Sequence, residues 1–248
     1  MVPIFYNLLL DLSPLLRILR ITISMSTAST QKTSLLFWLD IESLRAYTQA
    51  WRGWVKRWPL LDSHPLVCMC DGSQMDDDNW RLATDDLFGR DTKIILWEPE
   101  GKHCDEGTRN KAMLAAAGYV VSTTYSCFLD PKLTLTKKLI WPEADWFDED
   151  DPPAIICNRS ELGPSEIDCE KLEAWGSEAP GFSEMPSVDC DLIRAWDVAL
   201  VSQKFARVVA LISKNVIPVD RMDYFYYYCA LKRGERITRV NGEDMGIE

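Results

Sequence analysis

The sequence predicts an α/β fold (α+β overall), with a small parallel sheet and helices in an N-terminal lobe and a mixed α+β C-terminal lobe. Two patterns indicate this class. Between residues 40 and 126, short apolar runs alternate with amphipathic stretches, which is typical of strands joined by helices. From residue 192 onward, strand and helix signals resume after an acidic stretch. We therefore divide the 248 residues into an extension (1–33), an α/β lobe (34–130), an acidic loop-rich connector (131–191) and an α+β lobe (192–248).

The N-terminal lobe begins with a predicted helix over residues 40–58, because its apolar residues recur every three to four positions. Asp40 is a suitable N-cap, and Pro59 ends the helix. Further apolar periodicities predict the rest of the lobe: strands at 65–70, 93–97 and 119–126, and helices at 76–88 and 105–117. Gly89 and Gly118 stand where glycine commonly ends a helix.

The C-terminal lobe is predicted to begin with a strand at 198–201, followed by a helix capped by Ser202. Residues 216–219 are expected to start a further strand, and the tyrosine-rich residues 224–231 strongly favour β-structure. A turn at Gly234 then precedes a last strand.

The charge of the chain is concentrated in one segment. Residues 143–191 contain fifteen Asp and Glu against Arg159 and Lys171, whereas the whole chain has a net charge of −11. Such a protein is repelled by phosphates, so we expect no nucleic acid partner. Trp146 and Trp175 lie within the segment, which suggests either a solvated spacer or a docking surface with aromatic anchors.

The cysteines and the N-terminal residues bear on location. Eight cysteines are spread along the chain without a C-x-x-C pair, which suits a reducing compartment and predicts a cytoplasmic protein without cofactors. Residues 1–24 are apolar but interrupted by charges and a proline, so they do not predict a membrane span. We expect the folded protein to begin near Met25 and no membrane partner unless residues 1–24 are retained.

One group of carboxylates could bind a metal. Asp71 follows a predicted parallel strand, Asp76 and Asp78 come shortly after it, and Glu98 follows the next strand. Carboxylates gathered at one strand edge could hold Mg²⁺ for chemistry on phosphate esters. The competing interpretation is structural, because aspartates favour the first turn of a helix and Asp–Gly favours a turn. We find no nucleotide-binding glycine motif and no G-x-S-x-G elbow.

A C-terminal stretch resembles a group of bacterial immunity proteins that protect cells from polymorphic toxins. Val201, Ser202, Lys204 and Phe205 match the family's helix start, Ile217–Val219 match a following strand, and Tyr226–Tyr228 match a tyrosine-rich closing strand. The resemblance covers about residues 195–231, and Cys229-Ala230 replaces the family's usual Asn.

The resemblance and the acidic segment together predict a non-enzymatic immunity-like protein or inhibitor that binds a cationic protein, such as a toxin. The predicted contact residues are Trp146, Asp148, Glu149, Asp150, Asp151 and Trp175. The alternative is a metal-dependent enzyme acting on phosphate esters through Asp71, Asp76, Asp78 and Glu98.

Overall fold

The computed structural model describes residues 19–20, 33–58, 61–98, 105–129, 131–133, 135, 138, 152–158, 160–213 and 216–241. Their strands form one eight-stranded sheet with the order β1-β4-β3-β2-β5-β7-β6-β8. The strands are β1 (Leu19–Arg20), β2 (Thr33–Leu39), β3 (Leu66–Asp71), β4 (Lys93–Trp97), β5 (Tyr125–Leu129), β6 (Ile155–Asn158), β7 (Val198–Ser202) and β8 (Ile237–Val240). The predicted α/β class is confirmed.

Most of the sheet is parallel. Strands β4, β3, β2 and β5 pair side by side in parallel, and β6 pairs in parallel with β8. Strand β7 runs antiparallel between β5 and β6, and β1 is antiparallel to β4. Because β5 of the predicted first lobe pairs with β7 of the second, the sheet is continuous across both predicted lobes.

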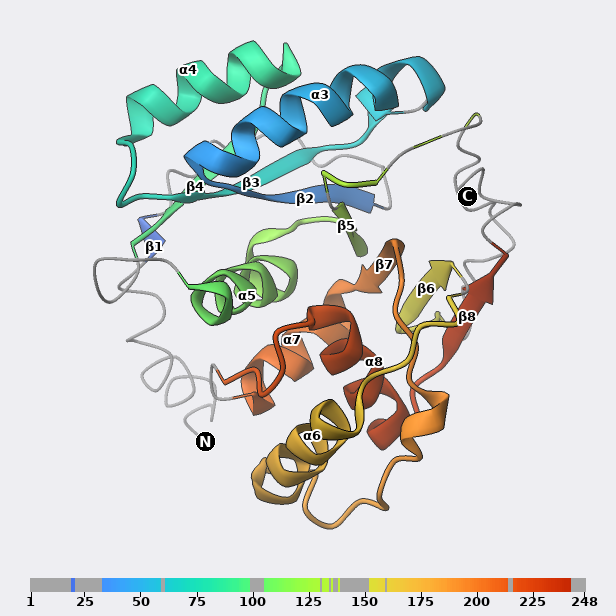
Figure 1. Ribbon diagram of the computed structural model, residues 1–248. Helices are drawn as coiled ribbons and strands as arrows, with labels where there is room; N and C mark the ends of the chain where they lie inside the picture. Colours follow the sequence, from blue (N-terminus) through green and yellow to red (C-terminus); the bar gives the residue numbers. More distant parts are fainter. Residues whose placement is uncertain are drawn as a thin grey trace, which may run out of the picture.

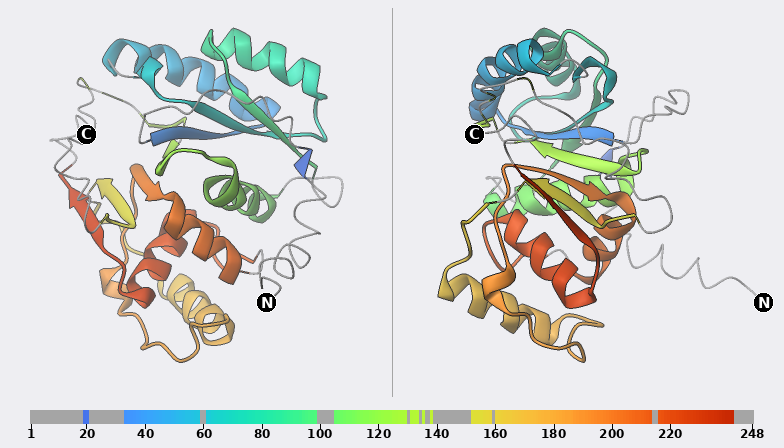
Figure 2. Two further views of the ribbon diagram at one scale, coloured as in Figure 1. Left: turned by 180° about the vertical axis from the view of Figure 1, so that it is seen from behind. Right: turned by 90° about the vertical axis from the view of Figure 1, so that its right-hand side faces the viewer.

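Helices cover both faces of the sheet (Figures 1 and 2). Helices α3 and α4 lie on one face, α5, α7 and α8 lie on the other, and α6 packs outside α8. Strand β2 supplies both cores: Leu35 and Phe37 face the α3 side, whereas Leu36 and Trp38 face the other side. The helices are α3 (Ile41–Arg57), α4 (Asp77–Phe88), α5 (Glu106–Ala115), α6 (Glu166–Glu178), α7 (Gln203–Ile212) and α8 (Met222–Arg233).

Several predicted ends agree with the structure. Asp40 caps α3 by accepting a hydrogen bond from the backbone of Ser43, and Ser202 caps α7 in the same way. Gly89 follows α4 in the left-handed conformation, at φ 65°. The predicted helix end at Gly118 is wrong, because Gly118 lies inside a π-helical turn that extends α5. The strand predicted at 119–126 begins only at Tyr125, as β5.

The largest error concerns the tyrosine-rich residues, which form helix α8 instead of a strand. Residues Tyr224 to Ala230 are at most 3% exposed, because α8 lies between α6 and the sheet. Burial on all sides overrides the β-preference of tyrosine. Residues 216–219 form no strand either, so two of the three segments behind the immunity-protein resemblance lack the expected structure.

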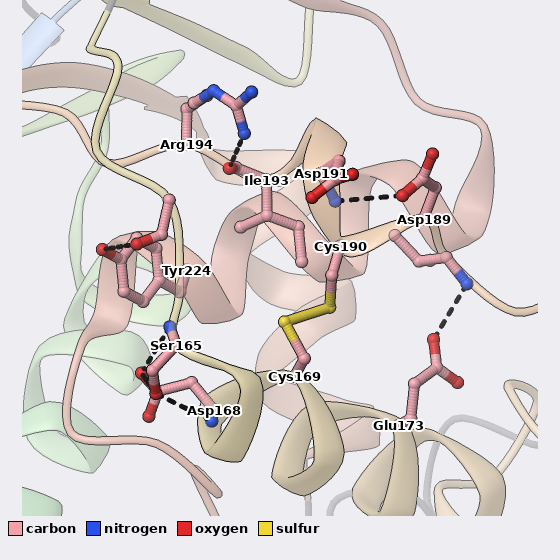
Figure 3. The surroundings of a disulfide bond; sticks show 12 residues. Ser165, Asp168, Cys169, Glu173, Asp189, Cys190, Asp191, Ile193, Arg194 and Tyr224 are labelled. Carbon is pink, nitrogen blue, oxygen red and sulfur yellow. Dashed lines mark hydrogen bonds between the residues drawn. A yellow bond between two sulfur atoms is a disulfide. The ribbon is translucent and has the colours of Figure 1, made fainter.

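The acidic segment contains more regular structure than a loop-rich connector would. Residues Ile155–Asn158 form strand β6, and Glu166–Glu178 form the 13-residue helix α6, which the sequence pattern did not predict. Only Leu172 and Gly176 of α6 are fully buried, so its sequence carries a weak apolar periodicity. Cys169 of α6 forms a disulfide with Cys190, a bond that the reducing compartment inferred from the cysteine pattern did not predict (Figure 3).

No helix in the described ranges is both long and apolar enough to cross a bilayer. Most of the predicted extension, including residues 1–18 and 21–32, lies outside the described residues. The division into four parts stays a prediction.

Candidate functional site

A cleft of about 900 Å³ opens where the strand order of the sheet reverses. From β2, the chain proceeds to β3 and β4 on one side, while β5 pairs on the other side. In open α/β sheets, ligands bind at the carboxyl ends of the strands at such a point. Trp38 of β2 and Phe128 and Leu129 of β5 line the cleft there. The other lining residues are Ser43, Tyr47, Glu106, Arg109, Asn110, Met113, Pro131, Lys132, Leu133, Trp196, Asp197, Asp220, Arg221, Met222 and Asp223.

Two hydrogen bonds from α3 hold the segment that follows β5. Tyr47 Oη donates to the carbonyl of Leu129 at 2.7 Å, and Trp54 Nε1 donates to the carbonyl of Leu133 at 2.9 Å. Both side chains are buried, so these bonds are protected from water. Helix α3 thereby fixes one wall of the cleft, which includes Lys132.

The opposite wall presents the carboxylate of Asp197, immediately before β7. Asn158, the last residue of β6, donates from Nδ2 to Asp197 Oδ2 at 2.9 Å. Asn158 Oδ1 in turn accepts from the backbone N–H of Asp197 at 2.9 Å and of Val198 at 3.1 Å. Asp197 is exposed whereas Asn158 is buried. No hydrogen bond to Asp197 Oδ1 is made by the residues that the structure describes.

Both carboxylate oxygens of Asp223, in the first turn of α8, accept hydrogen bonds. Arg221 donates from Nε to Asp223 Oδ1 at 3.0 Å and from Nη2 to Oδ2, and the Tyr224 N–H also donates to Oδ1. Burial disfavours the charge of Arg221, but the hydrogen bond to Asp223 and the charges of Asp223 and Asp197 together outweigh burial and raise the pKa of Arg221 above its ordinary value. Asp223 therefore fixes Arg221, while Asp197 keeps one carboxylate oxygen available.

The first turns of three helices lie at the cleft. Ser43 of α3, Glu106 of α5 and Met222 of α8 all line it. The positive ends of helix dipoles attract anions, and Arg109, Lys132 and Arg221 add three cationic side chains. The charged lining is mixed, because Glu106 pairs with Arg109 and Asp223 pairs with Arg221. The cleft thus combines aromatic surface and an exposed carboxylate with helix N-termini and the cation Lys132, which favour an anionic group.

The predicted metal ligands do not gather in this cleft. Asp71 is buried at the end of β3, where its carboxylate accepts from Ser73 and Gln74 in a turn. Asp76 caps α4, and Asp78 and Glu98 are exposed. Among the described residues, no three His, Cys, Asp or Glu side chains are grouped so that they could hold a metal ion. The structural interpretation of this group fits better.

The predicted partner-binding residues divide into two sets. Trp146 and Asp148, Glu149, Asp150 and Asp151 lie outside the described residues. Trp175 is partly buried and makes edge-to-face contacts with Phe182, Phe225 and Tyr228. Its indole therefore serves the packing of α6 on α8.

Comparison with known proteins gives matches to solved structures. No protein-family model and no curated protein matches the sequence. The galactosyltransferase LgtC, crystallised with donor and acceptor sugar analogs, aligns with a TM-score of 0.53 at 12% identity, over 84% of this chain and 73% of LgtC. This chain shares the fold of LgtC. An active-site mutant of LgtC gives a TM-score of 0.54 at 12% identity over the same shares, and the mannosyltransferase Ktr4p from S. cerevisiae gives 0.49 at 9% identity, over 86% and 70%.

This finding overturns the predicted function. The chain has the fold of a glycosyltransferase, so the prediction of a non-enzymatic immunity-like protein that binds a cationic partner is wrong, and so is the expectation that the chain is no enzyme. The acidic composition misled the prediction, because part of that charge lies on exposed positions of the folded helix α6.

The residues of the cleft were not predicted as a site. Asn158 and Asp197 are 39 positions apart, and neither belongs to a recognisable motif. The site could have been sought with the rule that ligands bind at the carboxyl ends of parallel strands. Applied to the sequence alone, this rule selected Asp71 and Glu98 as candidate ligands. The rule points to β2 and β5 only when the strand order is known.

Proposed function

We propose that this chain is a glycosyltransferase, which transfers a sugar from a donor with an anionic leaving group to the hydroxyl of an acceptor. The observation that carries the proposal is the cleft at the strand-order reversal, in a fold shared with a galactosyltransferase that binds donor and acceptor sugar analogs. A cleft of about 900 Å³ has room for both substrates.

Each wall of the cleft suits one part of this reaction. Arg109 and Lys132, with the first turns of α3 and α5, favour the negative charge of the leaving group. Trp38 and Trp196 offer aromatic surface on which a sugar ring can pack. Asp197 exposes an oxygen that can accept the proton of the acceptor hydroxyl.

The chemical step then balances as follows. The acceptor oxygen forms a bond to the anomeric carbon of the donor sugar, and its proton passes to Asp197. The bond between the anomeric carbon and the leaving oxygen breaks, and its electron pair leaves with the anionic group. Arg221 lies on the Asp197 side of the cleft, where its pairing with Asp223 holds it near the carboxylate that takes the proton.

The proposal is tested with a panel of nucleoside diphosphate sugars and simple sugar acceptors, by measuring release of the nucleoside diphosphate. We expect turnover with at least one donor, and a fall of about 100-fold or more in Asp197→Asn. Asp78→Asn is the matched control, because Asp78 is exposed on α4 and does not line the cleft. Absence of both turnover and nucleotide binding across the panel would overturn the proposal.

A further inference from the structure

The side chain of Asn158 connects two strands at the edge of the cleft. It is 3% exposed and lies at the end of β6, beside the start of β7. Its carbonyl oxygen accepts two backbone N–H groups, from Asp197 and Val198, while its amide nitrogen donates to the Asp197 carboxylate. One side chain thus fixes both the backbone and the carboxylate of Asp197.

The strand pairing alone does not require this arrangement. The ladder between β6 and β7 pairs Ile155, Ile156 and Cys157 with Val201, Leu200 and Ala199, so it ends before Asn158 and Asp197. The backbone at Asp197 is therefore held by a side chain in place of a ladder partner. A hydrophobic residue of similar size would fill the same space but would leave the buried N–H of Val198 and the part-buried N–H of Asp197 without this acceptor, which is costly.

Charged residues next to Asp197 explain why the orientation of its carboxylate has to be fixed. Asp223 of α8 and Arg221, the residue just before this helix, share this wall of the cleft with Asp197, and the charge of Asp197 acts on Arg221. The positive charge of this guanidinium attracts the Asp197 carboxylate, even though two of its N–H groups already donate to Asp223. The bond from Asn158 to Oδ2 keeps the carboxylate on the β6 side, which leaves Oδ1 for the cleft.

We propose that Asn158 is a positioning residue, which holds the Asp197 carboxylate so that Oδ1 faces the acceptor hydroxyl. This inference rests on the proposed glycosyl transfer and deepens it. Asn158 is buried behind Asp197 and is not among the lining residues of the cleft, so it acts through Asp197 and does not touch the substrates.

The decisive variant is Asn158→Asp. It keeps an oxygen that accepts the two backbone N–H groups, but it replaces the donor to Asp197 by a second carboxylate. Two adjacent carboxylates retain a proton more readily than one. We expect kcat to fall by about 10-fold or more, the KM of the donor to stay within about 3-fold, and the acidic limb of the pH–rate profile to move to higher pH.

Two further measurements keep the test independent of folding and of turnover. Asn79→Asp makes the same chemical change at an exposed position of α4 and should leave kcat and the pH profile unchanged. Hydrogen exchange reports the backbone bonds directly: the amides of Asp197 and Val198 should exchange at least about 10-fold faster in Asn158→Ala, whereas Asn158→Asp should largely preserve their protection.

The outcomes separate the two proposals. If the wild type turns over a donor and Asn158→Asp keeps its kcat and pH profile, the positioning role is wrong while glycosyl transfer stands. If the wild type neither binds nor turns over any donor, the proposed function fails. In that case the role of Asn158 toward an acceptor hydroxyl fails with it, and hydrogen exchange in Asn158→Ala then tests only whether Asn158 holds the backbone of Asp197 and Val198.

Discussion

The hydroxyl of Tyr228 on α8 occupies the space that a β-carbon at position 176 of α6 would need. Gly176 therefore allows a close approach between the two helices, and Trp175 beside it packs its ring edge-to-face on Phe225, at 4.8 Å between centroids. Glycine inside a helix normally costs stability, so its presence here indicates that the close packing outweighs that cost.

Gly176→Ala should destabilise the protein by about 2 kcal/mol or more, because the added methyl group overlaps a buried ring. Tyr228→Phe removes the hydroxyl and leaves Cζ, at 3.0 Å from the added methyl carbon, as the nearest atom. The cost of Gly176→Ala should therefore be smaller in the Tyr228→Phe background, which urea unfolding of all four proteins would measure. Equal costs in both backgrounds would show that the hydroxyl is not the obstacle.

Gly53→Ala is the matched control for that pair. Gly53 lies inside α3, and a β-carbon there meets nothing within 4 Å. The substitution should raise the free energy of unfolding by about 0.5–1 kcal/mol, because alanine is the better helix former. A loss of stability comparable to that of Gly176→Ala would contradict the steric explanation.

The disulfide between Cys169 and Cys190 joins α6 to the segment that leads into Asp197 (Figure 3). The bond closes a loop with a sequence separation of 21, so its loss in a Cys169→Ser/Cys190→Ser variant should cost roughly 3 kcal/mol. Thermal unfolding with and without reductant tests this. The wild type should lose stability on reduction and the variant should not respond, whereas identical curves for the reduced and oxidised wild type would argue against the bond.

His64 should make stability depend on pH. Burial lowers the pKa of His64 below 6.5, the ordinary value, while a hydrogen bond to the Thr33 carbonyl partly offsets this effect. The unfolded chain then binds a proton more readily, so stability is fully present above pH 6.5 and falls as the pH drops toward the folded pKa. His64→Gln should flatten this part of the curve, as measured by urea unfolding between pH 5 and 7.5. A slope identical to that of the wild type would exclude His64 as its source.

The sequence predicts local elements well where caps and periodicity agree, as for α3 with Asp40 and α4 with Gly89. The prediction fails where burial in the folded protein, and not local preference, determines the secondary structure. Residues Tyr224 to Tyr228 favour strands in isolation but form a helix that is buried on all sides. The central strand β2 was missed because both of its faces are buried, so its sequence shows no alternation. Without β2 the reversal of the strand order, and hence the cleft, could not be located from sequence.

The hydroxyls of Tyr47 and Tyr125 provide a paired test of how the cleft is held. Tyr47 donates to the carbonyl of Leu129 at the cleft end of β5, and Tyr125 donates to the carbonyl of Pro153 from the other end of the same strand. Tyr47→Phe and Tyr125→Phe each remove one buried hydrogen bond and keep the ring, so each should cost about 1 kcal/mol of stability. Only Tyr47→Phe loosens the segment with Lys132, so it alone should weaken binding of a nucleoside diphosphate, by about 3-fold or more in titration calorimetry. Equal loss of affinity in both variants would mean that β5 as a whole, and not the α3 contact, sets the geometry of the cleft.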